Sequence, residues 1–356
     1  MRVKLGDIFE IGSGGTPSKS HPEYYGGNIP WVKTGDLKNE YLYEVEDFIT
    51  EEGLNNSSAK MYEEDTVLIA MYGATIGATS ILKMKACTNQ ACAAFRKNEQ
   101  VIPEYLYYFL RSQKEKFVKD GVGGAQPNIS AGYLKKVKME LPSLDEQKVI
   151  VDILDKISDI VCKRSFELQS LDDLIKARFV EMFGNKGENP NGYEEDTLGN
   201  LYKFQYGKGN NIPEDKGEYP CYGSNGIVGH HTEYNNEDSP IIGHIGAYAG
   251  IVNWGAGKHY VTYNGVMCKL KTDRVNPTYG FHLLQQQDFN RVATKGGGQP
   301  FVSYGDLEAP IVVVPPIEVQ EAYATFADKV DKSKFIDIIN LLKILLFFKR
   351  GMYYGN

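Results

Sequence analysis

The sequence predicts an α+β protein made of two repeated, β-rich modules, each followed by one long helix. Three observations support this fold class. Residues 144–183 keep an apolar residue at every seventh position without a Pro or Gly. A glycine- and glutamine-containing block at 123–130 returns at 296–303. Short apolar runs of strand length, separated by many of the 37 Gly, fill the remaining chain.

The stretch 144–183 is expected to form a single amphipathic helix. Pro142 and Ser143 mark its start, and Gly184 follows its end. Its narrow apolar seam indicates a coiled-coil partner more than a globular core. The positions of that seam are Leu154, Val161, Leu168, Ile175 and Met182. A second apolar row is interrupted by Arg164 and Arg178.

Segments of the first module recur in the second module at a nearly constant distance along the sequence. Leu5-Gly6-Asp7 recurs 193 positions later, whereas matches from the middle of each module onward keep an offset of about 173. The second copy therefore lacks about twenty residues near its start. We expect a first recognition domain at 1–141, a central helix at 142–184, a second recognition domain at 185–314 and a C-terminal helix at 315–356.

Each module is expected to hold a twisted, partly antiparallel sheet. In the first module the predicted strands are 65–72, 79–82, 87–95 and 137–141, with a helix at 103–117. The corresponding strands of the second module are 240–245, 251–254, 261–270 and 311–314, with a helix from Pro277.

Composition limits the functional classes. The formal net charge is -7, so the chain is not a nucleic-acid binder by bulk charge. The five Cys form no CxxC pair and fit a reducing compartment. The first residues lack the apolar core of a signal peptide, and the apolar run 336–348 is too short and too polar to span a bilayer. We expect a cytoplasmic protein without a membrane partner.

The repeated Gly/Gln block is the first candidate site. Its glycines permit close backbone approach, and its glutamine amide can bond an adenine edge or a backbone group. A structural loop that joins module to helix is the alternative. The candidate DNA contacts in this block are Gly123, Gly124, Gln126, Asn128, Gly297, Gly298, Gln299 and Ser303.

A pair of glycine-flanked turns at 72–77 and 245–250 is the second candidate site. In each turn the glycines flank one residue that is expected to be exposed and that differs between the copies, Thr75 or Tyr248. A repeated scaffold with a variable tip is typical of a recognition loop, although an ordinary β-turn explains the glycines equally well. Tyr72, the first residue of its turn, and His244, which precedes the other turn, are also candidate DNA contacts.

Basic residues supply the third candidate site. Lys33, Thr34 and Lys38 follow Trp31, and the two lysines are suited to phosphates. Further basic residues flank the loops: Lys114, Lys116, Lys119, Lys135, Lys136 and Lys138 in the first module, and Lys269, Lys271, Arg274, Arg291 and Lys295 in the second. A solvated surface is the alternative for any one of them.

No catalytic constellation stands out. Asn276-Pro277-Thr278-Tyr279 faintly resembles the Asn-Pro-Pro-Tyr motif of amino-group DNA methyltransferases. Its repeat partner, Ile102-Pro103-Glu104-Tyr105, is better explained as a helix start. The histidines of the second module lack counterparts in the first, and we assign no metal site.

In this order, these motifs resemble the specificity subunit of type I restriction–modification systems. The matching segments are Leu5-Gly6-Asp7, Gly14-Gly15-Thr16-Pro17, 31–37, 72–77, 123–130, and the entries to the long helices at 142–147 and 315–320. The resemblance covers nearly the whole chain.

The resemblance implies a non-catalytic subunit that reads a bipartite target in double-stranded DNA, one half per module. It implies that two long helices pack as an antiparallel coiled coil with pseudo-twofold symmetry. It also implies two methyltransferase (M) subunits as partners, together with restriction (R) subunits. S-adenosylmethionine, ATP and Mg are then expected in those partners and no cofactor in this chain.

The C-terminal helix departs from the pattern. Its seam positions are Ala327, Lys334, Leu341 and Phe348, and Asp337 breaks the other row. We expect a degraded pairing, and Leu341 is counted with the seam of the first helix. Two alternative functions remain open: a protein-interaction scaffold without base readout, and a stand-alone DNA methyltransferase or nuclease.

Overall fold

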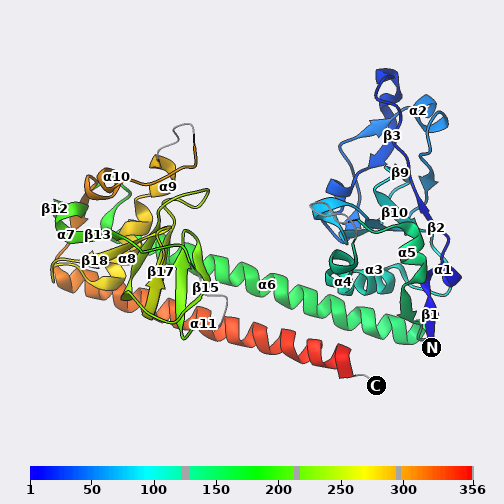
Figure 1. Ribbon diagram of the computed structural model, residues 1–356. Helices are drawn as coiled ribbons and strands as arrows, with labels where there is room; N and C mark the ends of the chain where they lie inside the picture. Colours follow the sequence, from blue (N-terminus) through cyan, green and yellow to red (C-terminus); the bar gives the residue numbers. More distant parts are fainter. Residues whose placement is uncertain (122–127, 212–216, 294–297, 355–356) are drawn as a thin grey trace. The chain divides into compact units, whose positions relative to one another are not determined.

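The computed structural model divides the chain into two units, residues 1–160 and 161–356 (Figure 1). It describes residues 1–121, 128–211, 217–293 and 298–354, with side chains described as far as residue 339. Both units mix helices and sheets, and the elements after the first strands recur in the same order. The expected α+β class and the internal repeat are therefore confirmed at this level.

Unit 1 contains three sheets. Their strand orders are β2-β10-β7-β8-β4, β5-β3-β9-β6 and β1-β11. The strands are β1 (Arg2–Lys4), β2 (Ile11–Ser13), β3 (Tyr25–Val32), β4 (Tyr41–Leu42), β5 (Phe48–Ile49), β6 (Met61–Tyr62), β7 (Val67–Ala70), β8 (Thr79–Leu82), β9 (Ala86–Thr88), β10 (Cys92–Phe95) and β11 (Lys138–Glu140). The pairs β3–β9 and β4–β8 are parallel and the rest are antiparallel.

The helices of unit 1 are short except the last. They are α1 (Leu5–Ile8), η1 (Pro22–Tyr24), η2 (Thr34–Asp36), α2 (Glu51–Asn55), η3 (Gly73–Thr75), α3 (Pro103–Ser112), α4 (Lys114–Asp120), α5 (Ala131–Lys136) and α6 (Leu144–Phe183), the last continuing into unit 2. The core lies between the β2–β10–β7–β8 strands and α3, where Ile69, Phe95 and Leu106 are buried. The helix predicted at 144–183 has the expected bounds.

Unit 2 repeats this plan with fewer insertions. A six-stranded sheet has the order β13-β18-β16-β17-β14-β15, and β12 pairs with β19. Its strands are β12 (Glu194–Thr197), β13 (Tyr202–Tyr206), β14 (Tyr219–Gly223), β15 (Gly226–His231), β16 (Asn236–Gly243), β17 (Val252–Val261), β18 (Gly265–Leu270) and β19 (Ile311–Val314). Its helices are α7 (Leu198–Leu201), α8 (Pro277–Gln286), α9 (Phe289–Val292), α10 (Tyr304–Glu308) and α11 (Ile317–Tyr354).

The length difference between the copies has a structural origin. Between β3 and β7, unit 1 holds η2, β4, β5, α2 and β6, whereas unit 2 holds only β15 between β14 and β16, a segment that is fully described. Of these additional elements, β5 and β6 are the outer strands of the sheet β5-β3-β9-β6, and β4 is the last strand of the sheet β2-β10-β7-β8-β4. The deletion inferred from the change of offset is therefore located in this region.

Two strand predictions were wrong in the same way. Residues 87–95 form two strands, β9 and β10, in different sheets, because the chain turns at Asn89, whose side-chain Oδ1 accepts from the Ala91 N–H at 3.1 Å. Residues 261–270 likewise contain the end of β17, a turn at 262–264, and β18. The helix predicted at 103–117 is also divided, at Gln113, into α3 and α4.

A buried glutamine joins each module to its long helix. Gln147 accepts from the Ile102 N–H at 2.9 Å and donates to the Gln100 and Pro142 carbonyls at 2.9 and 3.0 Å. Gln320, 173 positions later, accepts from the Asn276 N–H at 2.9 Å. It donates to the Arg274 and Pro315 carbonyls at 2.8 and 2.7 Å. Both side chains are fully buried, so each amide satisfies backbone groups that water does not reach.

Within unit 2, α11 runs alongside the second half of α6 in the opposite direction (Figure 1). Three contacts, taken in order along α6, show this direction: Arg164 pairs with Asp337 at 3.1 Å, Asp172 with Lys334 at 2.6 Å, and the Phe179 ring with that of Tyr323 at 5.4 Å between centroids. Ile175, Phe179 and Phe183 are buried here. Leu168 and Met182 are half-buried.

The polar residues that interrupt the apolar rows are paired with opposite charges. Arg164 meets Asp337, and Lys334, a seam position, meets Asp172 and Asp331. In the part of α11 whose side chains are described, the charged residues of the seam therefore have partners of opposite charge, and the degraded pairing stays a prediction. The side chain of Leu341 lies outside that part. In unit 1, Leu154 is half-buried, and in unit 2 so is Val161.

Candidate nucleic-acid interface

The predicted turns and the Gly/Gln blocks lie side by side in each unit. In unit 1, Tyr72 forms a bridge with Asn128, and the Ile129 N–H donates to the Met71 carbonyl at 3.0 Å. In unit 2, Ile245 forms the equivalent bridge with Phe301, and the Val302 N–H donates to the His244 carbonyl at 3.0 Å. Both copies thus bring two candidate segments, about 55 residues apart, to one edge of the sheet.

Four backbone hydrogen bonds build each turn, and all four repeat at the offset of 173. In unit 1 they run from Ile76 to Gly73, from Gly77 to Ala70, from Ala70 to Ala78 and from Ala78 to Thr75, at 2.8–3.1 Å. In unit 2 they run from Ala249 to Gly246, from Gly250 to Gly243, from Gly243 to Ile251 and from Ile251 to Tyr248, at 2.7–3.2 Å. The scaffold is therefore the same, while the tip residue differs.

The last glycine of each turn is required by its surroundings. Gly77 has φ +80° and Gly250 has φ +87°, a conformation that residues with a Cβ rarely adopt. A Cβ on Gly250 would also meet the Asn290 backbone nitrogen at 2.2 Å. In addition, the Asn290 side-chain amide donates to the Ala249 carbonyl at 2.7 Å. Asn290, which the sequence did not single out, therefore holds the turn that presents Tyr248.

Each turn has one exposed tyrosine. Tyr72 is 43% exposed and Tyr248 is 50% exposed. Thr75 is half-buried because its hydroxyl donates to the Tyr72 carbonyl at 3.1 Å. Asn128, Gly298 and Gln299 are exposed. Gly123, Gly124, Gln126 and Gly297 lie outside the described residues.

Ser303 has a structural partner. Its hydroxyl accepts from the Asp306 N–H at 3.3 Å and donates to the Asp306 carboxylate at 2.6 Å, which caps α10. Ser130, its counterpart, caps α5 by accepting from the Tyr133 N–H at 3.1 Å. The end of the repeated block therefore starts a short helix in both units.

The segment around Lys33 approaches the same edge in unit 1. The Asn89 N–H donates to the Val32 carbonyl at 2.9 Å, and the Met71 N–H donates to the Ala91 carbonyl at 2.8 Å. Lys33 forms an ion pair with Asp47, a hydrogen bond that raises the pKa of the lysine. Thr34 is half-buried in η2, and Lys38 is exposed. All three candidate segments of unit 1 thus converge near the 89–91 turn.

The counterpart of the Lys33 segment in unit 2, where sequence similarity fades, is revealed by strand register. Val32 pairs with Thr88, and Tyr222 pairs with Val261, which is Thr88 plus 173. The residue after Gly223, Ser224, donates to the Ile245 and Asn264 carbonyls at 2.7 and 3.0 Å. Ser224, whose hydroxyl binds two backbone carbonyls, therefore occupies in unit 2 about the position that Lys33 and Thr34 occupy in unit 1.

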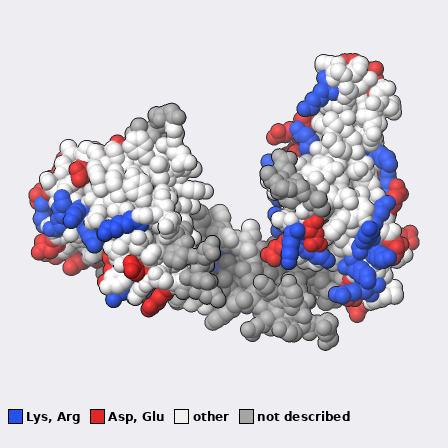
Figure 2. Space-filling model, viewed as in Figure 1, with Lys and Arg blue, Asp and Glu red and all other residues white. Residues whose placement is uncertain are grey.

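The expectation that basic residues flank the loops in both copies was wrong for most of the second set. Lys269 and Lys271 lie at the end of β18 opposite to the 262–264 turn, and Arg274 is paired with Glu194 and Asp196. Figure 2 shows Lys and Arg side chains gathered over α7, β13 and β18, whereas the visible surface around α9 and α10 is mostly uncharged. Arg291, in α9, is exposed beside the turn, and Lys295 lies outside the described residues.

In unit 1, α4 brings basic residues to the turn. The Cγ of Lys114 lies 2.9 Å from the position that a Cβ on Gly77 would occupy. Lys116 and Lys119 follow in the same helix and are exposed. Lys135, Lys136 and Lys138 belong instead to the α5–β11 side, where Lys138 pairs in register with Lys4.

Aromatic rings surround His244 at the recognition edge of unit 2, by which we mean the end of the sheet where the 245–250 turn lies beside the Gly/Gln block. The ring of Tyr206 is stacked between those of His244 and Tyr304, with centroids 4.1 and 4.3 Å away. Tyr263 meets His244 edge-on at 5.0 Å, and the His244 Nδ1–H donates to the Tyr263 carbonyl at 3.0 Å. Tyr206, Tyr263 and Tyr304 were missed because they come from three distant segments. The only signal in the sequence for the position of these tyrosines is the repeat offset, which makes Tyr263 equivalent to Gln90.

The segment that faintly resembles a methyltransferase motif is a helix start, as expected. Asn276 caps α8 by accepting from the Thr278 and Tyr279 N–H groups at 3.0 and 3.3 Å. Tyr279 is fully buried, and its hydroxyl donates to the Val313 carbonyl at 2.8 Å. Within the described ranges, no three His, Cys, Asp or Glu side chains form a group suited to a metal ion.

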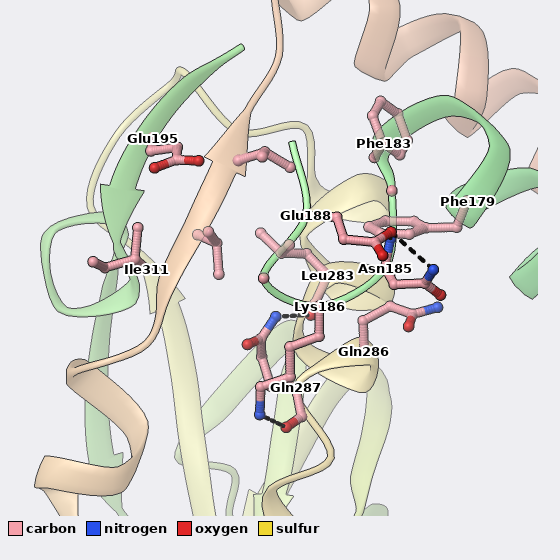
Figure 3. Close-up of a pocket in the computed structure, with 14 residues that line it drawn as sticks. Phe179, Phe183, Asn185, Lys186, Glu188, Glu195, Leu283, Gln286, Gln287 and Ile311 are labelled. Carbon is pink, nitrogen blue, oxygen red and sulfur yellow. Dashed lines mark hydrogen bonds between the residues drawn. The ribbon is translucent and has the colours of Figure 1, made fainter. Parts of the chain in front are cut away.

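A cavity of about 260 Å³ lies within unit 2, at the end of α6 (Figure 3). Phe179, Phe183 and Leu283 form its apolar side. The Lys186 ammonium crosses it to donate to the Gln287 carbonyl at 2.6 Å. None of the residues predicted to contact DNA lines this cavity. The cavity therefore belongs to the packing of the end of α6 on its module.

Taken together, the fold and this edge define a class of protein: two copies of one recognition module, each with a constant scaffold, a differing tip and a long helix behind it. The chain belongs to the family described as type I restriction modification DNA specificity domain, whose sequence model matches residues 1–168 and 190–345.

Curated relatives carry the same description. The type I restriction enzyme MjaIX specificity subunit of Methanocaldococcus jannaschii is 31% identical over 231 residues, which are 59% of this chain and 53% of that protein. The chain thus matches about half the length of that relative. The EcoprrI specificity subunit of Escherichia coli is 28% identical over 352 residues, 92% of this chain and 87% of that protein.

Solved structures share the fold. The S subunit of the type I restriction–modification system from M. genitalium has a TM-score of 0.56 at 16% identity, over 98% of this chain and 93% of that one. A chain from a study of complex assembly and conformational transition in the type I system has a TM-score of 0.58 at 14% identity, over 98% and 95%. Among the helices whose residues are described here, none is long and apolar enough to cross a bilayer.

Proposed function

We propose that this chain is the DNA-reading subunit of a type I restriction–modification complex and that each module reads one half of a bipartite target. The observation that carries the proposal is the turn described above. Four backbone hydrogen bonds repeat at a fixed offset, while the residue at the tip changes from half-buried Thr75 to exposed Tyr248. A fixed frame with a variable tip is what two readers of different half-sites require.

The chain itself performs no chemistry under this proposal. Two methyltransferase subunits bind S-adenosylmethionine and modify the DNA, and restriction subunits supply ATP- and Mg-dependent cleavage. Family membership supports this assignment. The stand-alone methyltransferase alternative loses its one motif, because Tyr279 is a buried residue of the α8 start rather than an exposed ring.

We also infer that α6 and α11 form an antiparallel coiled coil with pseudo-twofold symmetry. The Arg164–Asp337 pair supports this inference, because the two residues are exactly 173 positions apart, the offset of the repeat. When two equivalent positions touch, the axis that relates the two halves passes between them.

The proposal is tested by exchanging residues 1–141 for the corresponding module of another family member. The hybrid is co-expressed with its methyltransferase subunits, and modified adenines are mapped across the host genome. One half of the modified sequence should change and the other should stay. An unchanged motif would contradict base reading and favour an interaction scaffold, while S-adenosylmethionine binding by the isolated chain would favour the enzyme alternative.

A further inference from the structure

The two units present different chemistry at equivalent positions of the recognition edge. Strand register fixes the equivalence: Tyr206 pairs with Val266 in unit 2, as Ser13 pairs with Ala93 in unit 1. A backbone hydrogen bond gives the same equivalence. The His244 N–H donates to the Asn264 carbonyl in unit 2, and the Met71 N–H donates to the Ala91 carbonyl in unit 1, both at 2.8 Å. At the offset of 173, Tyr263 and Tyr304 then correspond to Gln90 and Ala131.

Four positions in unit 2 therefore carry rings where unit 1 carries none. We call Tyr206, His244, Tyr263 and Tyr304 the aromatic cluster. Unit 1 has a hydroxyl, a thioether, an amide and a methyl group at these positions, namely Ser13, Met71, Gln90 and Ala131. A fifth position follows the same trend, since exposed Phe301 corresponds to exposed Asn128. Unit 1 places its own aromatic residue, Tyr72, at the neighbouring position of Ile245.

The aromatic cluster is rigid and partly open to solvent. Stacking holds Tyr206 on both faces, and the Tyr206 N–H donates to the Tyr304 hydroxyl at 3.3 Å. Within the cluster, His244 is buried, whereas Tyr263 is 46% exposed and Tyr304 is 38% exposed. Large rings that are fixed in place and left half in water mark a surface that gains from being covered.

DNA bases offer one group that suits such a surface. In the major groove, thymine alone among the four bases presents a methyl group, and apolar side chains recognise it by contact. An amide instead suits the donor and acceptor edge of a purine. Gln90 of unit 1 is exposed and accepts a hydrogen bond from the Thr16 hydroxyl, which orients its amide.

We propose that the aromatic cluster is the base-reading surface of unit 2 and that Tyr263 and Tyr304 read the 5-methyl group of a thymine. Unit 1 reads its half-site without this contact, through the Gln90 amide at the position equivalent to Tyr263. This inference deepens the proposed function and rests on it. It adds the residues and the kind of base contact that distinguish one half-site from the other.

The test removes the methyl group from the DNA. The target is first identified by adenine-methylation mapping with the complete complex, and the half-site of unit 2 is assigned by module exchange. Each thymine is then replaced singly by deoxyuridine, which lacks only the 5-methyl group, and the dissociation constant of the complex for each duplex is measured. At least one replacement in the half-site of unit 2 should weaken binding about fourfold, the value of one buried carbon.

The same replacement is then measured on protein variants. In Tyr263→Ala or Tyr304→Ala, the wild-type penalty for deoxyuridine should disappear, while replacements in the other half-site keep their wild-type effect. Tyr234→Ala is the matched control, because Tyr234 in unit 2 is also 46% exposed but lies between β15 and β16. It should leave every deoxyuridine effect unchanged.

Three results would overturn the proposal: a half-site of unit 2 without an A·T pair, tolerance of deoxyuridine at every position in it, or a penalty that persists in both tyrosine variants. The wild-type measurements need no folded variant, so they decide the question even where a substitution harms folding. Failure of the proposed function looks different, because then module exchange leaves the modified sequence unchanged.

Discussion

At the scale of single residues, two buried glutamines tie the modules to their helices. Gln147 and Gln320 each make three hydrogen bonds to backbone groups and are fully buried. Removing one amide leaves buried backbone donors and acceptors without partners, and each such group costs about 1–3 kcal/mol. These residues therefore contribute to stability and to the orientation of each helix relative to its own module.

Gln147→Ala and Gln320→Ala should each lower the free energy of unfolding by about 3 kcal/mol. Urea denaturation followed by circular dichroism measures the loss. Gln169→Ala, on an exposed face of α6, is the matched control and should change stability by less than about 0.5 kcal/mol. If the two variants lost no more stability than the control, the hydrogen bonds of the buried glutamines would not be needed for stability.

His259 gives unit 2 a dependence on pH. Its Nδ1–H donates to the Gly257 carbonyl at 2.8 Å, and its Nε2 accepts from the Asn236 amide at 3.0 Å, so the ring is neutral. Burial lowers the pKa of His259 below its ordinary value of 6.5, and burial likewise lowers the pKa of His282. Protonation therefore favours the unfolded chain, and the stabilisation present above about pH 6.5 is lost as the pH falls.

Between pH 7.5 and pH 5.5, wild-type protein should lose more unfolding free energy than His259→Gln, which cannot titrate. Urea titrations at both pH values give the comparison. His282→Gln should remove a second share of the dependence. Equal losses in wild type and both variants would mean that other groups control the acid sensitivity.

At the scale of elements, the pairing of α6 with α11 combines aromatic packing with charge. Phe179 and Phe183 pack on Tyr323, and the polar interruptions meet as Arg164–Asp337 and Asp172–Lys334. The aromatic contacts supply most of the stabilisation, because partly exposed ion pairs contribute about 0.2–1 kcal/mol each. The charges chiefly fix the register of one helix on the other.

Reversing one charge tests this register. Arg164→Asp places two carboxylates together and should destabilise the protein by about 1 kcal/mol, and Asp337→Arg should do the same. The double variant should recover most of the loss, which a double-mutant cycle of thermal unfolding would show. Additive losses in the double variant would mean that the two residues do not interact in solution.

Elements with local signals could be predicted from the sequence, and those with remote partners could not. The bounds of α6 follow from its heptads, its Pro142-Ser143 start and Gly184. The turn at 262–264 was missed although Asn264-Gly265 is a strong turn signal, because the surrounding apolar residues read as one strand. The charge pairing between α6 and α11 is tertiary, so charged residues that interrupt the seam in one helix have partners of opposite charge in the other.

The candidate site was predicted to a similar extent. The turns and the Gly/Gln blocks were found as repeats, and the structure brings them together through the Tyr72–Asn128 and Ile245–Phe301 bridges. The aromatic cluster was not found, because Tyr206 and Tyr304 are 98 positions apart and neither has an aromatic counterpart in the first module. Its members share a place only after the strands are in register.

At the scale of the whole molecule, the proposed complex makes helix length a determinant of target spacing. An α-helix rises 1.5 Å per residue, and duplex DNA advances about 3.4 Å per base pair. Removing one heptad from both α6 and α11 should therefore shorten the gap between half-sites by about three base pairs. A heptad keeps the apolar seam in phase, so the pairing itself survives.

Methylation mapping of the shortened protein with its partner subunits checks this prediction. Both half-site sequences should stay as in wild type, with a smaller gap between them. A variant that lacks five residues from each helix is the control. Five residues turn a helix by about 500°, which leaves the seam about 140° out of phase, so this variant should fail to assemble. Unchanged spacing in the heptad variant would count against the helices as the determinant of spacing.

The contact between Arg164 and Asp337 also bears on how the chain recognises its own halves. These residues occupy the same position in the two repeats, so a dimer of two identical halves packed in this manner would oppose Arg to Arg or Asp to Asp. Like charges repel at such a contact, whereas the two different halves attract. The contact between Arg164 and Asp337 therefore favours pairing between the two different halves of the chain. If the halves were separated, each would bind the other half more tightly than a copy of itself.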